Sequence, residues 1–213
     1  EEDAEADTFL GVDLARFGED DSVIYLNNNG KLRRYAKWTK ATSVESANRV
    51  HQAAIETGAS QVRVDGAGLG GPVIDQLAVL AQGKYTVISM MGSAASPDRT
   101  RYYNARAYNF DSLREQMLNG KIDIDIDDKE LFDEMMMLRY KFSNLGSIQI
   151  ESKDEMKSRG VKSPDNLDAA VYATVDLSHL IESPYGDKKP GDRVYADPEL
   201  MTVQDPFYSG WTW

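Results

Sequence analysis

Two short apolar segments of this chain each end in an aspartate, and this repeated pattern constrains the fold more than any other feature. Residues 8–13 (Thr-Phe-Leu-Gly-Val-Asp) and 61–65 (Gln-Val-Arg-Val-Asp) are rich in residues that favour β-strands. If these strands are neighbours in one sheet, Asp13 and Asp65 emerge side by side at its carboxyl edge, where open α/β sheets bind ligands. We therefore predict an acidic site at this edge.

The segments around these two strands predict a mixed sheet. Ser22–Asn27 and Lys31–Trp38 form a hairpin around Asn28-Asn29-Gly30, which is a strong turn signal. Helical patterns then alternate with the strands at 61–65 and 85–89, which predicts parallel crossovers. The predicted fold class is therefore α/β, with a mixed central sheet, an antiparallel first hairpin and helices on both faces.

Capping signals and apolar periodicity place the helices. Thr42-Ser43-Val44-Glu45 is a capping box that opens a helix ending before Gly58. The last helix begins at Ser163-Pro164, with serine as its N-cap and proline at the first helical position. Further helices are expected after Pro72, over about 104–118 and around 131–138, and a second hairpin at 140–150. The expected buried positions are Val44, Ala47, His51, Ala54 and Ile55 on the first helix, Met135, Met136 and Met137, and Leu167, Val171, Thr174, Val175 and Ile181 on the last helix.

Composition narrows the chemistry open to this chain. With no cysteine and two histidines in 213 residues, thiolate sites are excluded and a histidine-rich zinc site is disfavoured. No apolar run is long enough to span a bilayer. The net charge of −11 is concentrated at the ends, since residues 1–7 carry five acids and no base, and residues 182–213 carry six acids against three bases. We expect an acidic linker at 1–7, one domain at 8–182, and a tail at 183–213 that wraps the surface or is disordered.

The carboxylates point to divalent cations. Two-metal cleavage of a phosphodiester needs cations roughly 3.5–4 Å apart, one activating water and the other stabilising the leaving oxygen. Carboxylate oxygens suit Mg²⁺ or Mn²⁺ in such a site. Asp165 and Asp168 are three residues apart and share one face of the last helix. We expect Asp13, Asp65 and Asp168 to hold the cations, with Asp165 as a further candidate, in a protein that cuts nucleic acid.

Three motifs resemble the nuclease domain of phage large terminase subunits. They are Gly-Val-Asp13 with the following Ala-Arg-Phe-Gly-Glu-Asp-Asp, Val-Asp65-Gly-Ala-Gly-Leu-Gly-Gly, and Lys-Ser-Pro-Asp-Asn-Leu-Asp168-Ala. The resemblance covers about residues 8–181, and its last motif is the most specific. It implies an RNase H-like fold and an endonuclease that makes the double-strand cuts at the start and end of genome packaging. By this resemblance Asp13, Asp65 and Asp168 are the metal-binding acids, whereas Asp165 matches a position that varies.

The resemblance also implies partners that this chain does not contain. Large terminase subunits carry an N-terminal packaging ATPase, yet the chain has no Gly-x-x-x-x-Gly-Lys-Ser/Thr loop. We expect the nuclease domain alone, with residues 1–7 as the remnant of an interdomain linker, and no ATP hydrolysis by this chain. The implied partners are double-stranded DNA, that ATPase domain, the portal and the small terminase subunit, in the host cell cytoplasm and with no membrane.

Several residues have competing interpretations. Lys153, Lys162, Arg99 and Arg101 are candidates for DNA phosphate contacts, although a solvated, salt-bridged surface explains such charges equally well. Asp20-Asp21 is either an ordinary turn or part of a second cation site. The competing functions are another RNase H-like nuclease of the Holliday-junction resolvase type, an actin-like or sugar-kinase-type ATP-binding domain, and a non-catalytic docking module of a packaging motor.

Overall fold

A computed structural model describes residues 7–15, 20–67 and 70–177. Most of the predicted linker and tail, with Ile181, lies outside these residues. A six-stranded sheet has the order β5-β4-β1-β2-β3-β6, and a separate hairpin pairs β7 with β8. The strands are β1 (Thr8–Asp13), β2 (Ser22–Asn28), β3 (Lys31–Trp38), β4 (Gln61–Asp65), β5 (Thr86–Met90), β6 (Asp123–Ile124), β7 (Tyr140–Phe142) and β8 (Ile148–Ile150).

The pairing of the strands confirms the predicted mixed sheet. β1, β2 and β3 are antiparallel neighbours, and β4 lies parallel to both β1 and β5. This arrangement follows from the chain, because the Asn-Asn-Gly turn joins β2 to β3 directly, while β4 and β5 each follow a helix.

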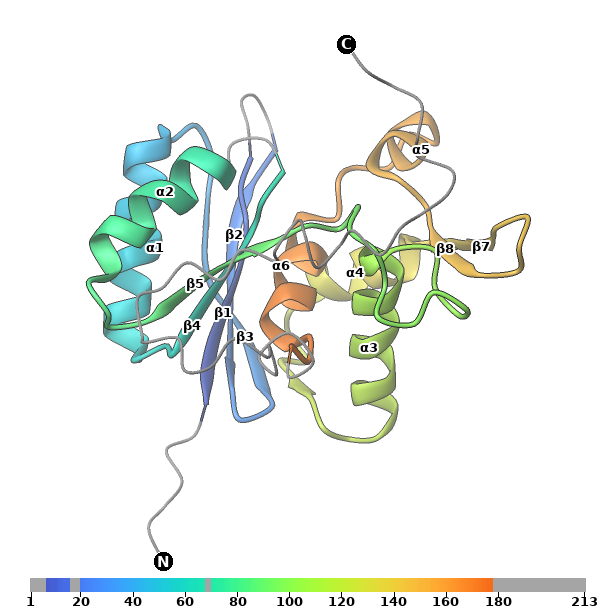
Figure 1. The fold of residues 1–213 in the computed structure, drawn as a ribbon, viewed down its shortest axis with the longest axis horizontal. Helices are drawn as coiled ribbons and strands as arrows, with labels where there is room; N and C mark the ends of the chain where they lie inside the picture. The colour runs from blue at the N-terminus through green and yellow to red at the C-terminus, as the bar shows by residue number, and fades with distance from the viewer. Residues whose placement is uncertain (1–6, 16–19, 68–69, 178–213) are drawn as a thin grey trace, which may run out of the picture.

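Helices cover both faces of the sheet, as predicted (Figure 1). α1 (Ser43–Thr57) and α2 (Gly70–Ala81) form one layer. On the other face α6 (Asp165–Thr174) lies against the strands, with α3 (Ala105–Leu118) and α4 (Lys129–Met137) outside it. α5 (Lys153–Ser158) follows the β7–β8 hairpin. None of the described helices is long and apolar enough to cross a membrane.

Side chains that alternate along the strands point to opposite faces of the sheet and so divide the apolar core into two parts, one against each layer of helices. Leu10 and Val12 of β1 pack in the cluster that includes α1 and α2, while Val23 and Tyr25 of β2 pack with α6. Side chains two residues apart share a face of a strand, so Gly11 and Asp13 both face α6. The acidic site therefore forms on the α6 side of the sheet.

Gly11 marks the place where α6 rests directly on β1. A Cβ atom on Gly11 would lie 2.1 Å from the carbonyl oxygen of Ala169 and 2.3 Å from the amide nitrogen of Ala173. Every residue of α6 is buried, which is typical of a helix that is enclosed on all sides. The backbone of the strand and that of the helix are thus in contact, with no room for a side chain between them.

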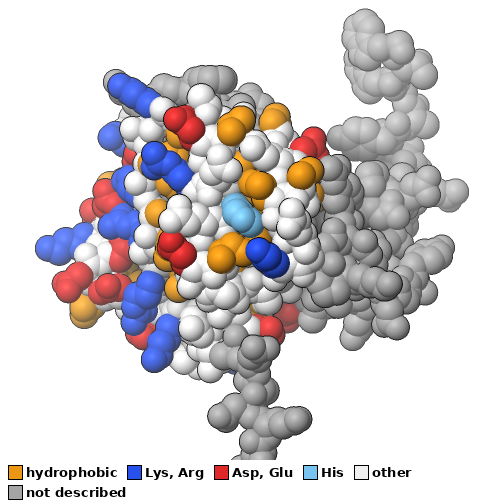
Figure 2. Space-filling view, turned by 90° about the vertical axis from the view of Figure 1, so that its left-hand side faces the viewer, with side chains coloured by type: hydrophobic (Ala, Val, Ile, Leu, Met, Phe, Trp, Pro, Cys, Tyr) orange, Lys and Arg blue, Asp and Glu red, His pale blue; other side chains and the backbone are white. Residues whose placement is uncertain are grey.

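The predicted burial of two helices is partly wrong. On α1 the side chains of Val44 and Ile55 are exposed, and the buried positions are Ser46, Ala47, Val50, Ala53 and Ala54. Figure 2 views the molecule from the α1 and α2 side, where hydrophobic side chains are visible around the histidine. On α1, His51 is half-buried, and its Nδ1 lies 2.8 Å from the hydroxyl of Tyr85. On α4, Met136 and Met137 are also exposed rather than in the core.

The start of α6 differs from the prediction because a distant residue caps it. α6 begins at Asp165, and its capping position is Pro164, which offers no side-chain hydrogen bond, so Ser163 is not the N-cap. Instead Glu134 of α4 accepts hydrogen bonds from the backbone amide of Leu167, at 2.7 Å, and from the side chain of Asn166, at 2.6 Å. The helix ends at Thr174, earlier than the periodicity predicted.

Substitution of Gly11 by alanine should destabilise the fold. The added methyl group meets backbone atoms of α6, so the helix must move away from β1, and overpacking of this kind costs about 3 kcal/mol or more. Urea unfolding followed by circular dichroism measures the loss. Gly71→Ala on α2 is the matched control, because nothing lies within 4 Å of a Cβ at that position. Equal stability of the two variants would contradict a backbone contact at Gly11.

Candidate active site

The ends of β1 and β4 bring two carboxylates together, as the sequence predicted. These strands pair in parallel, with Val12 opposite Val64, so Asp13 and Asp65 leave adjacent positions at the same edge. Asp13 is buried, and Asp65 is half-buried with its Oδ1 accepting a hydrogen bond from the amide of Ala67 at 2.9 Å. Both carboxylates are therefore held by the sheet and the turn that follows it.

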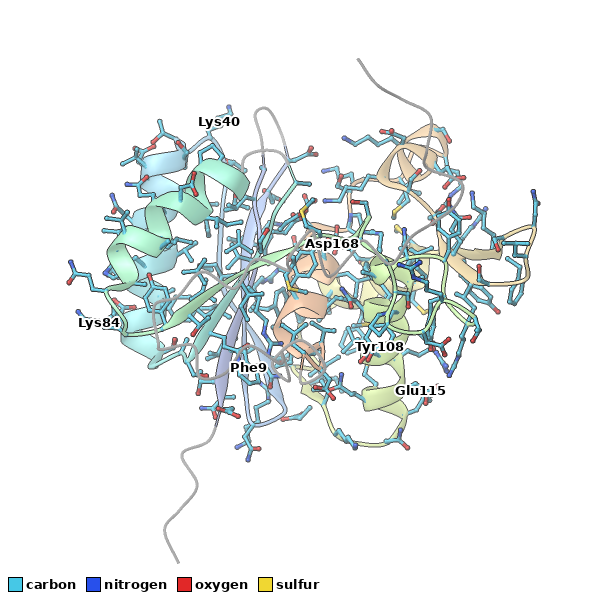
Figure 3. The ribbon with its side chains drawn as sticks, in the orientation of Figure 1. Phe9, Lys40, Lys84, Tyr108, Glu115 and Asp168 are labelled. Carbon is cyan, nitrogen blue, oxygen red and sulfur yellow. The ribbon has the colours of Figure 1, made fainter. Side chains whose placement is uncertain are left out.

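The first turn of α6 adds two more carboxylates. Asp168 is fully buried and Asp165 nearly so, and Figure 3 shows Asp168 at the end of α6 nearer to α5. An acidic side chain at a helix N-terminus gains from the helix dipole. Asp165 Oδ2 also accepts a hydrogen bond from the amide of Asp21 at 3.3 Å. The loop after β1 is thereby connected to the same cluster.

Lys153 of α5 places its ammonium group among these acids. Its Nζ lies 3.2 Å from Asp13 Oδ2, 3.0 Å from Asp168 Oδ2 and 3.7 Å from Asp165 Oδ1. Sequence reasoning proposed Lys153 as a DNA contact and did not predict α5. The signal for that helix was present, since Ser152 and Glu155 form a capping box like the one that opens α1.

Arg106 is a member of the site that sequence reasoning missed. From the first turn of α3 its Nη1 donates to Asp168 Oδ1 at 2.7 Å, and its side chain is mostly buried. Its neighbours in the sequence are those of an ordinary helix, and only the packing of α3 beside α6 brings it to the acids. No local pattern marks it.

Burial dominates the electrostatics of the cluster. It raises the pKa of Asp13 well above its usual range, against the opposing effect of Lys153, and the other acids raise it further. Burial likewise raises the pKa of Asp65, and it raises that of Asp165 to about 6. For Lys153 burial alone lowers the pKa, but the carboxylates of Asp168, Asp13 and Asp165 outweigh it and raise the pKa. The acids and the lysine therefore stabilise each other's charged forms.

The other predicted basic residues lie apart from this cluster. Arg101 forms an ion pair with Asp111 at 3.0 Å. Arg99 and Lys162 are exposed, and neither forms an ion pair with any of the described residues. Asp20 and Asp21, which the sequence left open, pair with Lys157 at 3.7 Å and with Lys37 at 2.9 Å. Of the four basic candidates, Lys153 alone forms ion pairs with the acids of this cluster in the described part of the chain.

The donor set fits a hard divalent cation. Its ligand atoms are carboxylate oxygens, and an ammonium group already lies within 3.7 Å of three of the carboxylates. Asp168 Oδ2 is buried and makes no hydrogen bond, although it is in ion-pair contact with Lys153. In the described part of the chain no three acidic or histidine side chains form a ready-made metal-binding group. Lys153 occupies the space between the acids instead.

The raised pKa of Asp165 predicts a pH-dependent stability. Since its pKa is about 6 in the folded state against an ordinary 3.8, the folded protein takes up a proton between about pH 4 and 6. The stability that the protonated Asp165 carboxyl contributes to the folded state is fully present below about pH 4 and is lost as the pH rises through about 6. In EDTA, the free energy of unfolding of the parent should fall by roughly 2 kcal/mol between about pH 4 and 7 because of this one group. Asp165→Asn lacks the group, so its free energy of unfolding should not show this part of the fall.

Urea unfolding across this pH range measures the difference. Asp133→Asn is the control, because Asp133 is an exposed carboxylate on α4. Parallel stability curves for the parent and Asp165→Asn would contradict the raised pKa.

Comparison with known proteins identifies the fold. No protein-family profile matches the sequence, and no curated protein matches it. The structure is similar to the nuclease domain of the large terminase subunit of bacterial virus Sf6, with a TM-score of 0.73 and 22% identity over 82% of this chain and 90% of that one. The large terminase nuclease of thermophilic phage G20c gives a TM-score of 0.60 and 16% identity over 79% and 81%. The large terminase nuclease domain of Thermus phage P74-26 gives a TM-score of 0.56 and 17% identity, over 79% of this chain and 78% of that one.

Several of these structures contain divalent cations. The K428A mutant of the Sf6 domain is known with manganese, with manganese and β-thujaplicinol, and with calcium, and the G20c nuclease with magnesium and with cobalt. At these levels of identity the similarity establishes the fold. It confirms the resemblance predicted from the three aspartate motifs: this chain has the RNase H-like fold of the nuclease domains of phage large terminase subunits.

Proposed function

We propose that this protein is a metal-dependent endonuclease that cuts double-stranded viral DNA at the initiation and termination of genome packaging. One observation carries the proposal. The carboxylates of Asp13, Asp165 and Asp168 lie within 3.7 Å of a single ammonium group, and Asp65 follows β4 beside the end of β1, within the fold of terminase nuclease domains. This edge is also where sheets of this class bind ligands.

Asp13, Asp65 and Asp168 are the proposed ligands, and Asp165 is a further one. Mg²⁺ or Mn²⁺ suits their hard oxygen atoms, and in such sites the cations activate water and stabilise the leaving oxygen. The chain itself supplies rigid positions. Asp13 and Asp65 are fixed by paired strands, while Asp168 is fixed by a buried helix. Rigid ligands suit a reaction that depends on the alignment of the phosphate.

Lys153 has a proposed place in both states of the site. Without a cation its ammonium balances the charge of the acids, which otherwise repel one another. Its side chain is about one-third exposed and belongs to a helix of six residues. When a cation binds, we expect the lysine to leave the acids and contact a DNA phosphate nearby.

The proposed DNA surface extends to basic residues outside the acidic cluster. Arg99 and Lys162 are exposed without ion pairs among the described residues, so they are available to phosphates, whereas Arg101 must first leave Asp111. Such contacts make binding sensitive to salt. The proposed partners are DNA, the packaging ATPase domain, the portal and the small terminase subunit, and the proposed location is the host cytoplasm.

Loss of a proposed ligand should abolish cleavage. Asp13→Asn, Asp65→Asn and Asp168→Asn should each lower Mn²⁺-dependent cleavage of plasmid DNA by at least roughly 100-fold, the scale of losing one electrostatic contact at a reacting centre. Asp133→Asn, on the surface of α4, should cleave like the parent. Unchanged nicking by Asp13→Asn or Asp168→Asn would refute the proposal, and cleavage of branched DNA alone would favour a junction resolvase.

Removal of the ammonium group should strengthen cation binding. Two like charges about 4 Å apart repel by roughly 4 kcal/mol at a protein-like dielectric, and a third of this already gives a tenfold effect. Lys153→Ala should therefore bind Mn²⁺ about tenfold or more tightly in isothermal titration calorimetry. Lys157→Ala, on the same helix and 3.7 Å from Asp20, is the matched control. Weaker Mn²⁺ binding by Lys153→Ala would mean that the lysine does not compete with the cation.

A further inference from the structure

The two oxygens of Asp168 contact different cationic side chains. Oδ1 accepts a hydrogen bond from Arg106 Nη1 at 2.7 Å. Oδ2 lies 3.0 Å from the ammonium of Lys153 but lacks the alignment of a hydrogen bond. One oxygen is therefore bound firmly, and the other faces the space shared with Asp13 and Asp165.

The two cationic side chains differ in how firmly they are held. Arg106 is anchored by its backbone amide, which donates to Gly92 at 3.0 Å, and its guanidinium carbon lies 4.5 Å from the centre of the Phe110 ring. Its side chain is 16% exposed, against 35% for Lys153. Of the two side chains, Lys153 is thus the one more open to displacement by a cation, whereas Arg106 is held beside Asp168.

The contact with Asp168 determines where the guanidinium lies. Arg106 Nε and Nη2 are buried and have no hydrogen-bond partner. Buried donors without partners are costly, so the position of Arg106 is not explained by its own hydrogen bonding. The single bond to Oδ1 and the contact with the Phe110 ring hold the group in place.

We propose that Arg106 is a positioning residue that occupies Oδ1 of Asp168 and leaves only Oδ2 to bind a divalent cation. This inference rests on the proposed nuclease site and adds a rule for its choice of metal. Ca²⁺ accepts six to eight oxygens and can take both oxygens of one carboxylate. Mg²⁺ requires near-octahedral geometry, which favours a single oxygen from each carboxylate. An Asp168 restricted to one oxygen therefore disfavours Ca²⁺ relative to Mg²⁺ or Mn²⁺.

Affinities for Ca²⁺ and Mn²⁺ test this role in the full chain. Each ion alone is titrated calorimetrically into the parent and into two variants, and the ratio of the two dissociation constants is compared. Arg106→Met removes both the charge and the donor, so Asp168 gains a free second oxygen. The ratio should shift toward Ca²⁺ by about tenfold, the equivalent of about 1.4 kcal/mol. Arg106→Lys keeps the charge and an N–H donor directed at Oδ1, so the ratio of the two dissociation constants should stay within twofold of the parent.

These two variants separate positioning from a general effect of charge or stability. A ratio within twofold of the parent in Arg106→Met, or an equal shift in Arg106→Lys, would overturn the proposal, since loss of charge alone changes the affinity for both divalent ions alike. A second measurement needs no Arg106 variant: crystals of the parent and of Lys153→Ala are soaked in Mn²⁺. Coordination by Oδ2 alone, with Oδ1 still on Arg106, supports the role. Coordination by both oxygens overturns it and leaves the nuclease proposal standing, whereas no Mn²⁺ at the four acids in either protein overturns both.

Discussion

The contact between α6 and β1 at Gly11 is the constraint on which both the fold and the site depend. At this point the backbones of helix and strand touch, because Gly11 has no side chain and the facing residues of α6 are alanines. Asp13 follows Gly11 on the same face of the strand, and Asp168 directly precedes Ala169. The separation of these two carboxylates is therefore set by a backbone contact and not by flexible side chains. The same contact between Gly11 and α6 therefore packs the core and sets the geometry of the site.

The acids assembled by this contact act against stability. Burial raises the pKa of Asp13, Asp65 and Asp165, and it also raises that of Glu134, which caps α6, to about 7. These shifts mean that the ionised carboxylates are less stable in the folded protein than in water. The positive charges of Lys153 and Arg106 offset part of this cost. The apolar layers on both faces of the sheet supply the stability that tolerates this arrangement. Such concentrated strain is common at functional sites.

The sequence predicted those parts of the structure that local patterns determine. The end of β1 beside that of β4 followed from two apolar runs and the rules for parallel strands, so Asp13 and Asp65 could be placed together. The positions of Arg106 and Glu134 could not be foreseen, because both depend on how α3 and α4 pack on α6. Burial on α1 was misjudged since small residues such as Ser46 and Ala53, rather than Val44 and Ile55, face the core. Helices that lie close together favour small residues over large apolar ones, and hydrophobicity alone does not reveal this.

The central place of α6 also governs how the chain can fold. It is the last of the described helices, yet it packs on the first strands, as in the hydrogen bond from Asn27 to the carbonyl of Ala173, 146 residues later. Contacts of such high sequence separation slow folding. During synthesis the first strands form while one apolar face of their sheet is still uncovered, a state that invites aggregation. When α6 packs on that face it adds Asp165 and Asp168 to Asp13 and Asp65, which the pairing of β1 with β4 has already brought together, so the covering of the core and the completion of the acidic cluster are one step.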